Sequence, residues 1–176
     1  MTLFFPDNTV LVNFAHIRQI SVLEGLLQGR GRWVSSVAAE CERSAELVQL
    51  EDLKNVPEIL GAPIRSDRAE RVDARAIQIR LRAPGDPSGR SFGESETIAV
   101  IVRRQLDAMF LTDDRGAIDY LAVGHPEIKV FRTTDLLALA VRVGSFSAED
   151  AVAHLAVLRE RRRTRMPDST FLRLLN

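Results

Sequence analysis

The sequence predicts one three-layer α/β/α domain in which a short parallel sheet is flanked by helices. Its 176 residues suit a single domain, and 45% of them are hydrophobic, which supplies a sizeable core. Short apolar runs alternate with helical segments of about 10–15 residues, a pattern typical of parallel strands joined by helices. We expect the main domain to span residues 1–145. Residues 146–176 are expected to add a helix and an arginine-rich tail that pack on the same domain.

Apolar runs mark the expected strands. The first spans residues 2–5 and ends at Pro6-Asp7, and the others are AMFLT at 108–112 and IKVFR at 128–132. RWVSS, at 32–36, is a further short candidate.

Cap residues and glycines delimit the expected helices. Asn8 or Thr9 can cap the first helix, and Ser147 can cap the last, which should continue through the arginine run to Pro167. Ser35 or Ser36 can cap the third helix. The two prolines and three glycines between residues 83 and 93 predict a loop. A second helical stretch is expected to carry Leu23, Leu26 and Leu27 and to end before Gly29. The remaining helices are expected within 51–82 with a break near 61–63, at 94–106, at 115–124, and at 133–143.

Charge and cysteine content exclude several classes of protein. The 24 basic residues balance 24 acidic residues, so the chain as a whole is not attracted to nucleic acid or to a membrane surface. No apolar run approaches the roughly 18 residues that cross a membrane, and the first residues lack the pattern of a signal peptide. The single Cys41 excludes an internal disulfide. We therefore expect a cytoplasmic protein that does not bind membranes.

Carboxylates follow two of the expected strands. Asp7 comes directly after the first, and Asp113 and Asp114 follow the strand about a hundred residues later. In an open α/β sheet, functional groups gather beyond the carboxyl ends of the strands. Any one of these residues alone is typical of a helix start. Two such positions at one edge of the sheet indicate a site.

Converging carboxylates repel one another unless a cation compensates their charge. Oxygen ligands of this kind suit Mg²⁺ or Mn²⁺, which activate water and stabilise a leaving alkoxide in phosphodiester cleavage. Further acidic residues lie on the expected helices: Glu40, Glu94 and Glu96.

Four segments, in this order, resemble the PIN-domain family, which includes the VapC-like toxin ribonucleases. They are FPDNTVLVNF, VSSVAAECER, GESETIAVIV and FLTDDRGAIDYLA. The resemblance covers Leu3 to about Gly144. It implies a PIN-like fold over residues 1–145 and a metal-dependent endoribonuclease, the toxin of a bacterial type II toxin–antitoxin pair. RNA as substrate, an antitoxin encoded nearby, and a homodimer follow from the same resemblance.

The resemblance also implies roles for individual residues. Asp7, Glu40, Glu94 and Asp114 match the acidic cluster that binds Mg²⁺ or Mn²⁺ and carries catalysis. Thr112 matches a hydroxyl residue that orients water or a carboxylate, and Asn8 has a similar position beside the first acid. Glu96 is an alternative to Glu94 as a metal ligand, and Asp113 is an alternative to Asp114.

Two other functions compete with this interpretation. A haloacid-dehalogenase-like phosphatase would use Asp7 as nucleophile, but Thr9 stands where its acid/base aspartate is needed. A PIN-like scaffold that has lost activity and only binds a partner is the alternative without catalysis, although all four acidic positions are filled. Fold similarity alone does not separate these functions.

Basic residues crowd the C-terminal region, where five arginines lie within residues 159–165. Such a run can be a solvated helix end that complements the helix dipole. It can also contact RNA phosphates or an acidic segment of an antitoxin. The residues singled out for such a contact are Arg161, Arg162 and Arg163.

Overall fold

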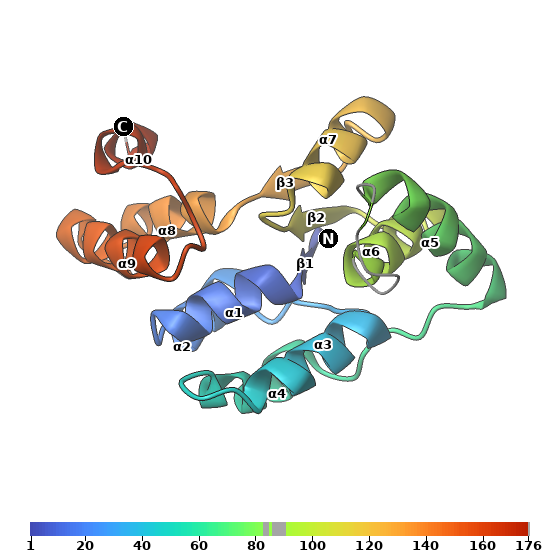
Figure 1. The fold of residues 1–176 in the computed structure, drawn as a ribbon, viewed down its shortest axis with the longest axis horizontal. Helices are drawn as coiled ribbons and strands as arrows, with labels where there is room; N and C mark the ends of the chain where they lie inside the picture. The colour runs from blue at the N-terminus through green and yellow to red at the C-terminus, as the bar shows by residue number, and fades with distance from the viewer. Residues whose placement is uncertain (83–84, 86–90, 176) are drawn as a thin grey trace.

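A computed structural model describes residues 1–82, 85 and 91–175. Within these residues the chain forms a parallel three-stranded sheet in the order β1-β2-β3, with helices around it (Figure 1). In the register, Phe5 lies opposite Phe110, which in turn lies opposite Val130. The predicted mixed α/β fold with a short parallel sheet is confirmed. The strands are β1 (Leu3–Pro6), β2 (Ala108–Leu111) and β3 (Lys129–Phe131).

Helices connect and cover the strands (Figure 1). Those before β2 are α1 (Asn8–His16), α2 (Ile20–Leu27), α3 (Ser35–Ala45), the 3₁₀ helix η1 (Glu51–Asn55), α4 (Val56–Leu60), α5 (Arg68–Leu81) and α6 (Phe92–Arg103). Those after β2 are α7 (Arg115–Gly124), α8 (Thr133–Arg142), α9 (Ala148–Glu160) and α10 (Asp168–Leu175). None of the helices in the described part of the chain is long and apolar enough to cross a membrane.

Alternating side chains of the strands face two separate cores. Phe5 and Phe110 belong to a cluster with residues of α5, α6 and α7. Phe4, Leu111 and Phe131 pack on the opposite side, in a larger cluster formed mainly by α1–α4 and α8–α10. The alternation follows from the period of two residues in a strand. The short sheet is therefore an inner layer between two layers of helices.

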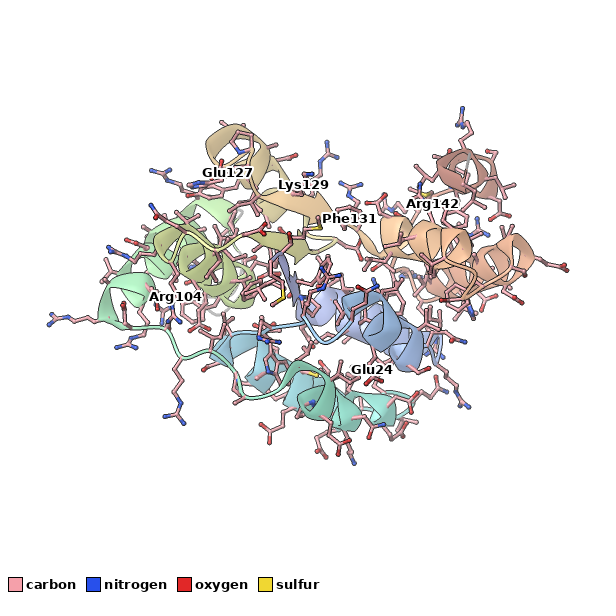
Figure 2. The ribbon with its side chains drawn as sticks, turned by 180° about the vertical axis from the view of Figure 1, so that it is seen from behind. Glu24, Arg104, Glu127, Lys129, Phe131 and Arg142 are labelled. Carbon is pink, nitrogen blue, oxygen red and sulfur yellow. The ribbon has the colours of Figure 1, made fainter. Side chains whose placement is uncertain are left out.

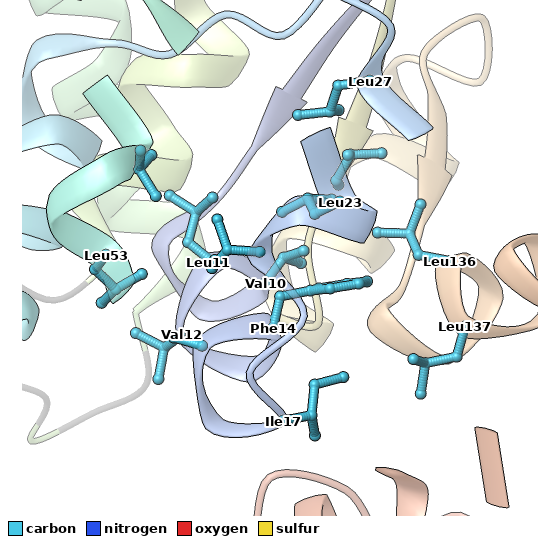
Figure 3. Packing of buried hydrophobic residues seen from close by; sticks show 14 of the residues in the cluster. Val10, Leu11, Val12, Phe14, Ile17, Leu23, Leu27, Leu53, Leu136 and Leu137 are labelled. Atoms are coloured by element: carbon cyan, nitrogen blue, oxygen red, sulfur yellow. The ribbon is translucent and has the colours of Figure 1, made fainter. Parts of the chain in front are cut away.

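Helix α1 lies at the centre of the larger cluster, where side chains from α2, η1 and α8 surround it (Figure 3). Leu11 and Phe14 of α1 are fully buried, and Leu23, Leu53 and Leu137 pack in the same cluster. Burial of a side chain of this size contributes about 1.5–3 kcal/mol. The start of α1, which follows β1 directly, is thus held firmly in place.

The last helix ends earlier than the sequence predicts. Helix α9 stops at Glu160 instead of continuing through the arginines, and α10 follows after Pro167. Arg162 has a left-handed φ of 56°. The Arg163 N–H donates to the Leu158 carbonyl at 2.8 Å, and the Arg162 N–H to the Arg159 carbonyl at 2.9 Å. These two bonds form a Schellman motif, which reverses the chain without a glycine.

The expected strand at 32–36 is wrong. Two isolated bridges replace it, one joining Phe4 to Gly31 and the other Val34 to Ile64. Residues 31–34 make one bridge to β1 at Phe4 and one bridge to Ile64. Neither pairing is long enough to form a strand.

Helices α1 and α3 begin at Asn8 and Ser35, so their N-caps lie one residue before the expected caps. Asp7 and Val34 have extended backbones and precede these helices, whereas Ser147 caps α9 as predicted. Most of the expected loop at 83–93 lies outside the described residues, and its last two residues begin α6. The predicted caps that are instead helical are Asn8, Thr9, Ser35 and Ser36.

Candidate functional site

Two of the predicted acids meet at the carboxyl edge of the sheet through Thr112. The Asp7 N–H donates to the Leu111 carbonyl at 2.9 Å, which ties the end of β1 to the end of β2. The Thr112 hydroxyl donates to Asp7 Oδ2 at 3.3 Å and accepts the Asp114 N–H at 3.1 Å. Thr112 is fully buried. It therefore links the first acid to the backbone of the last.

Asp114 also begins helix α7. Its Oδ1 accepts the Ala117 N–H at 2.8 Å, as expected of an N-cap. Asp7 is the N-cap residue of α1, although its side chain makes no cap hydrogen bond, so both acids stand at helix starts beyond neighbouring parallel strands. The positive ends of both helix dipoles face this edge, which favours anions there.

Glu40 and Glu94 reach the same edge from α3 and α6. Gly93 makes this approach possible, because a Cβ atom at residue 93 would lie 3.1 Å from Glu40 Oε1 and 3.2 Å from Oε2. The same Cβ would lie 3.1 Å from a methyl group of Val37. The Glu40 carboxylate thus rests directly on the backbone beside Glu94.

The four carboxylates act on one another electrostatically. Burial raises the pKa of Glu94 to about 8, and the charges of Asp7, Asp114 and Glu40 add to this rise. Burial and the charge of Asp7 raise the pKa of Glu40 to about 7, although Arg43 and the Gly93 backbone oppose the change. Each of these shifts means that the folded protein resists full ionisation of the site.

Asp7 is the most enclosed of the four acids, with 1% of its surface exposed. Burial raises its pKa to about 6, while groups at the start of α1 and Thr112 oppose the change. Within the described part of the chain, Asp7 Oδ1 has no hydrogen-bond partner. A buried carboxylate oxygen without a donor is costly, so a cation at this position would stabilise it.

The arrangement is not a preformed metal cage. In residues 1–82, 85 and 91–175, no three His, Cys, Asp or Glu side chains lie in an arrangement that could hold a metal ion as they stand. The donor set itself, composed of carboxylate oxygens, suits a hard divalent cation. The carboxylates are near enough to perturb one another, and a bound cation would have to draw them together.

Glu96 lies next to this cluster in sequence but is engaged elsewhere. Its Oε2 accepts the Ser36 N–H at 2.9 Å and also the Ser36 hydroxyl. Its Oε1 accepts the Ser66 hydroxyl at 2.5 Å. Glu96 is buried and ties the start of α3 to α6.

Asp113 likewise has hydrogen-bond partners on both oxygens. Oδ1 accepts the Thr133 N–H at 3.0 Å, and Oδ2 accepts the Thr133 hydroxyl and an amide hydrogen of Asn13 at 2.8 Å. The side chain fixes the start of α8 to α1. Both alternative ligands therefore have structural partners on each of their carboxylate oxygens.

Asn8 donates from Nδ2 to the Ser44 hydroxyl at 3.2 Å. It lines a surface cleft of about 310 Å³ that opens beside Glu40. Arg43 and Leu47 complete this cleft, which places a cation and an apolar side chain next to the acidic edge. A separate and larger cleft of about 760 Å³ lies between α3 and α4, and none of the four acids lines it.

The three singled-out arginines occupy different environments. Arg162 is exposed, and Arg161 is exposed while donating to Gln49. Arg163 instead points inward and donates to Asn13. The sequence predicted neither the role of Asn13 nor this role of Arg163. The signal in the sequence was that Asn13 is a polar residue within the apolar run of α1.

No protein-family model, curated protein or solved structure matches the chain.

Proposed function

We propose that the protein is a PIN-like endoribonuclease that hydrolyses RNA phosphodiester bonds with Mg²⁺ or Mn²⁺. The observation that carries the proposal is the convergence of Asp7, Glu40, Glu94 and Asp114, which come from four separate segments of the chain. Their mutual repulsion is unfavourable for the fold alone, and a bound cation would remove it. An arrangement kept at such a cost is typical of a functional site.

The oxygen atoms of these four side chains would hold the ion. When bound, such an ion lowers the pKa of water and neutralises charge that develops on the phosphate and the leaving oxygen. The unpartnered Oδ1 of Asp7 and the all-oxygen donor set support this assignment.

The chain's own residues supply orientation and exclusion of water. Thr112 holds Asp7 from one side, and burial of Asp7 keeps bulk solvent away from that carboxylate. Arg43, at the adjacent cleft, offers a cation to an RNA phosphate that approaches Glu40. Glu40 and Glu94, which hold protons near neutral pH without a cation, become ionised as one binds.

The biological role follows from the resemblance to VapC-like proteins. We propose a toxin that acts in the cytoplasm as a homodimer and is inhibited by an antitoxin encoded beside it. Co-purification with the product of the adjacent gene tests the antitoxin, and light scattering of the purified protein tests the dimer.

The decisive experiment is cleavage of single-stranded RNA by the purified protein with Mn²⁺ and with EDTA. Cleavage should require Mn²⁺ and should vanish in Asp7→Asn and Asp114→Asn, each of which deletes one charged ligand at constant size. Asp52→Asn, on the exposed side of η1, is the matched control and should retain full activity. Full activity in both site variants would exclude the acidic site.

Two outcomes favour the competing functions. Hydrolysis of p-nitrophenyl phosphate without RNA cleavage would indicate a phosphatase that uses Asp7 as nucleophile. Absence of both activities, together with tight binding of a partner, would indicate a scaffold.

A further inference from the structure

Arg163 turns from the C-terminal segment into the acidic edge of the sheet. The Schellman motif that ends α9 reverses the chain at Arg162, so that the next side chain faces α1. Nε of Arg163 donates to Asn13 Oδ1 at 2.6 Å, and a terminal nitrogen donates to the Thr9 carbonyl at 3.4 Å. Arg163 thus contacts the first turn of α1, directly after Asp7.

Asn13 connects Arg163 to Asp113 and Thr133. It is buried, and its Nδ2 donates to Asp113 Oδ2 at 2.8 Å and to the Thr133 hydroxyl at 2.9 Å. Arginine has only donor groups, so Arg163 must face the amide oxygen of Asn13. The amide hydrogens then have to point at Asp113. Asp113, whose oxygens only accept, requires the same orientation, so Arg163 and Asp113 hold the Asn13 amide from its two ends.

Asp113 immediately precedes Asp114, and both of its oxygens are occupied by Asn13 and Thr133. The contacts of Arg163 consequently reach both ends of the acidic site. One reaches the start of α1 behind Asp7, and the other reaches the turn that carries Asp114. The guanidinium charge also lies near Asp7 and Asp113, whose charges oppose the lowering of its pKa by burial.

We propose that Arg163 is a positioning residue for the acidic site, acting through Asn13, and that it does not contact RNA. This inference rests on the proposed function for its catalytic consequence. It separates Arg163 from Arg161 and Arg162, which remain available on the surface.

The test compares Arg163→Ala with Arg142→Ala, a control at the exposed end of α8 (Figure 2). Loss of an outer partner of a metal ligand typically costs 10–100-fold. We expect kcat of Arg163→Ala to fall by about 10- to 100-fold. The KM for RNA and its salt dependence should change by less than about twofold, since no phosphate contact is lost. Added guanidinium should restore part of the lost rate.

Titration with Mn²⁺ alone provides a readout that does not need RNA. A displaced Asp114 and Asp7 should bind Mn²⁺ about tenfold more weakly in Arg163→Ala than in the wild type or in Arg142→Ala. Simple removal of a positive charge would act in the opposite direction and tighten Mn²⁺ binding. If the wild type cleaves no RNA, the proposed function fails, and the sign of this change still decides the role of Arg163.

Three results would overturn the inference. A higher KM with a flatter salt dependence would make Arg163 an RNA contact. A lower melting temperature with unchanged kcat and unchanged Mn²⁺ affinity would make it a purely structural residue. Unchanged or tighter Mn²⁺ binding would exclude positioning. Should Arg163→Ala not fold, Arg163→Met, which keeps a long side chain but has no donor group, is measured in the same assays with the same criteria.

Discussion

Ser66 donates its hydroxyl hydrogen to the carboxylate of Glu96 over 2.5 Å, and this bond separates the roles of two neighbouring glutamates. Glu96 also receives both the N–H and the hydroxyl of Ser36, so its two oxygens are occupied. Glu94, two positions earlier, lies instead among the other acids, whose charges raise its pKa. One glutamate thus holds the fold, and the other lies in the candidate site.

Replacement of each glutamate by glutamine should give opposite results. Glu94→Gln should abolish Mn²⁺-dependent RNA cleavage and leave the metal-free fold as stable or more stable, because repulsion is relieved. Glu96→Gln should lower the free energy of unfolding by about 1–3 kcal/mol, because the amide cannot accept all three hydrogen bonds. Urea unfolding and RNA cleavage per folded molecule measure the two effects. Loss of cleavage in a fully stable Glu96→Gln would reverse the assignment.

The metal-free protein should become less stable as the pH rises from about 5 to about 8. Glu94 and Glu40 have folded-state pKa values of about 8 and about 7, above their ordinary value, so the folded state binds more protons than the unfolded state in this window. The stabilisation is complete below the ordinary pKa and is lost as the pH passes the folded values. Urea unfolding at several pH values measures this slope.

The contribution of Glu94 to that slope is the difference between the wild type and Glu94→Gln. This comparison is needed because burial lowers the pKa values of His16 and His154, which makes the protein more stable as the pH rises near 6. Glu149→Gln, on the exposed start of α9, should leave the slope unchanged. Mn²⁺ should restore stability at pH 8, since it binds only the folded site. A slope unaffected by Glu94→Gln would contradict the repulsion among the acids.

Gly93→Ala tests Glu40 without removing its carboxylate. The added Cβ would lie 3.1 Å from Glu40 Oε1, so the carboxylate must move by a few tenths of an ångström. Alanine favours helix over glycine by up to about 1 kcal/mol, and the free energy of unfolding should change by no more than that. RNA cleavage should fall about tenfold, because small displacements of catalytic groups are costly. Gly124→Ala, with open space around its Cβ, is the control. Equal activity of the two variants would remove Glu40 from the site.

The exposed arginines should contribute to RNA binding without affecting the rate at saturation. Arg161→Gln with Arg162→Gln should weaken RNA binding and flatten the plot of log affinity against log salt by about 0.7 per lost contact. Filter binding of RNA at several salt concentrations measures this slope, and Arg142→Gln is the control. An unchanged slope would leave these arginines as solvated surface, and weaker binding of the adjacent gene's product alone would assign them to an antitoxin contact.

The sequence predicted the parts of the fold that depend on local patterns. Apolar runs located β1, β2 and β3, and the helix expected at 115–124 has those bounds in the structure. The end of α9 was missed because Arg162 takes a left-handed conformation that usually marks a glycine. No local signal announces such a residue.

The site was predictable only as a set of acids at strand ends. Asp7 and Asp114 follow strands, and neighbouring parallel strands bring them to one edge. The separate roles of Glu94 and Glu96 depend on a contact between α3 and α6 across 60 residues of sequence. Asn13 was missed for the same reason, since its partner Asp113 lies 100 positions away.

The pairing of β1 with β2 also sets the order in which the protein acquires its site during synthesis. Asp7 and Thr112 are 105 positions apart, and the pairing of β1 with β2 joins their segments. Contacts of such long range form slowly, because the chain must lose the entropy of closing a large loop before it gains the energy of the contact. A nascent chain that ends before β2 carries Asp7, Glu40 and Glu94 but lacks Thr112 and Asp114. The acidic edge therefore forms only after the ribosome has produced most of the chain.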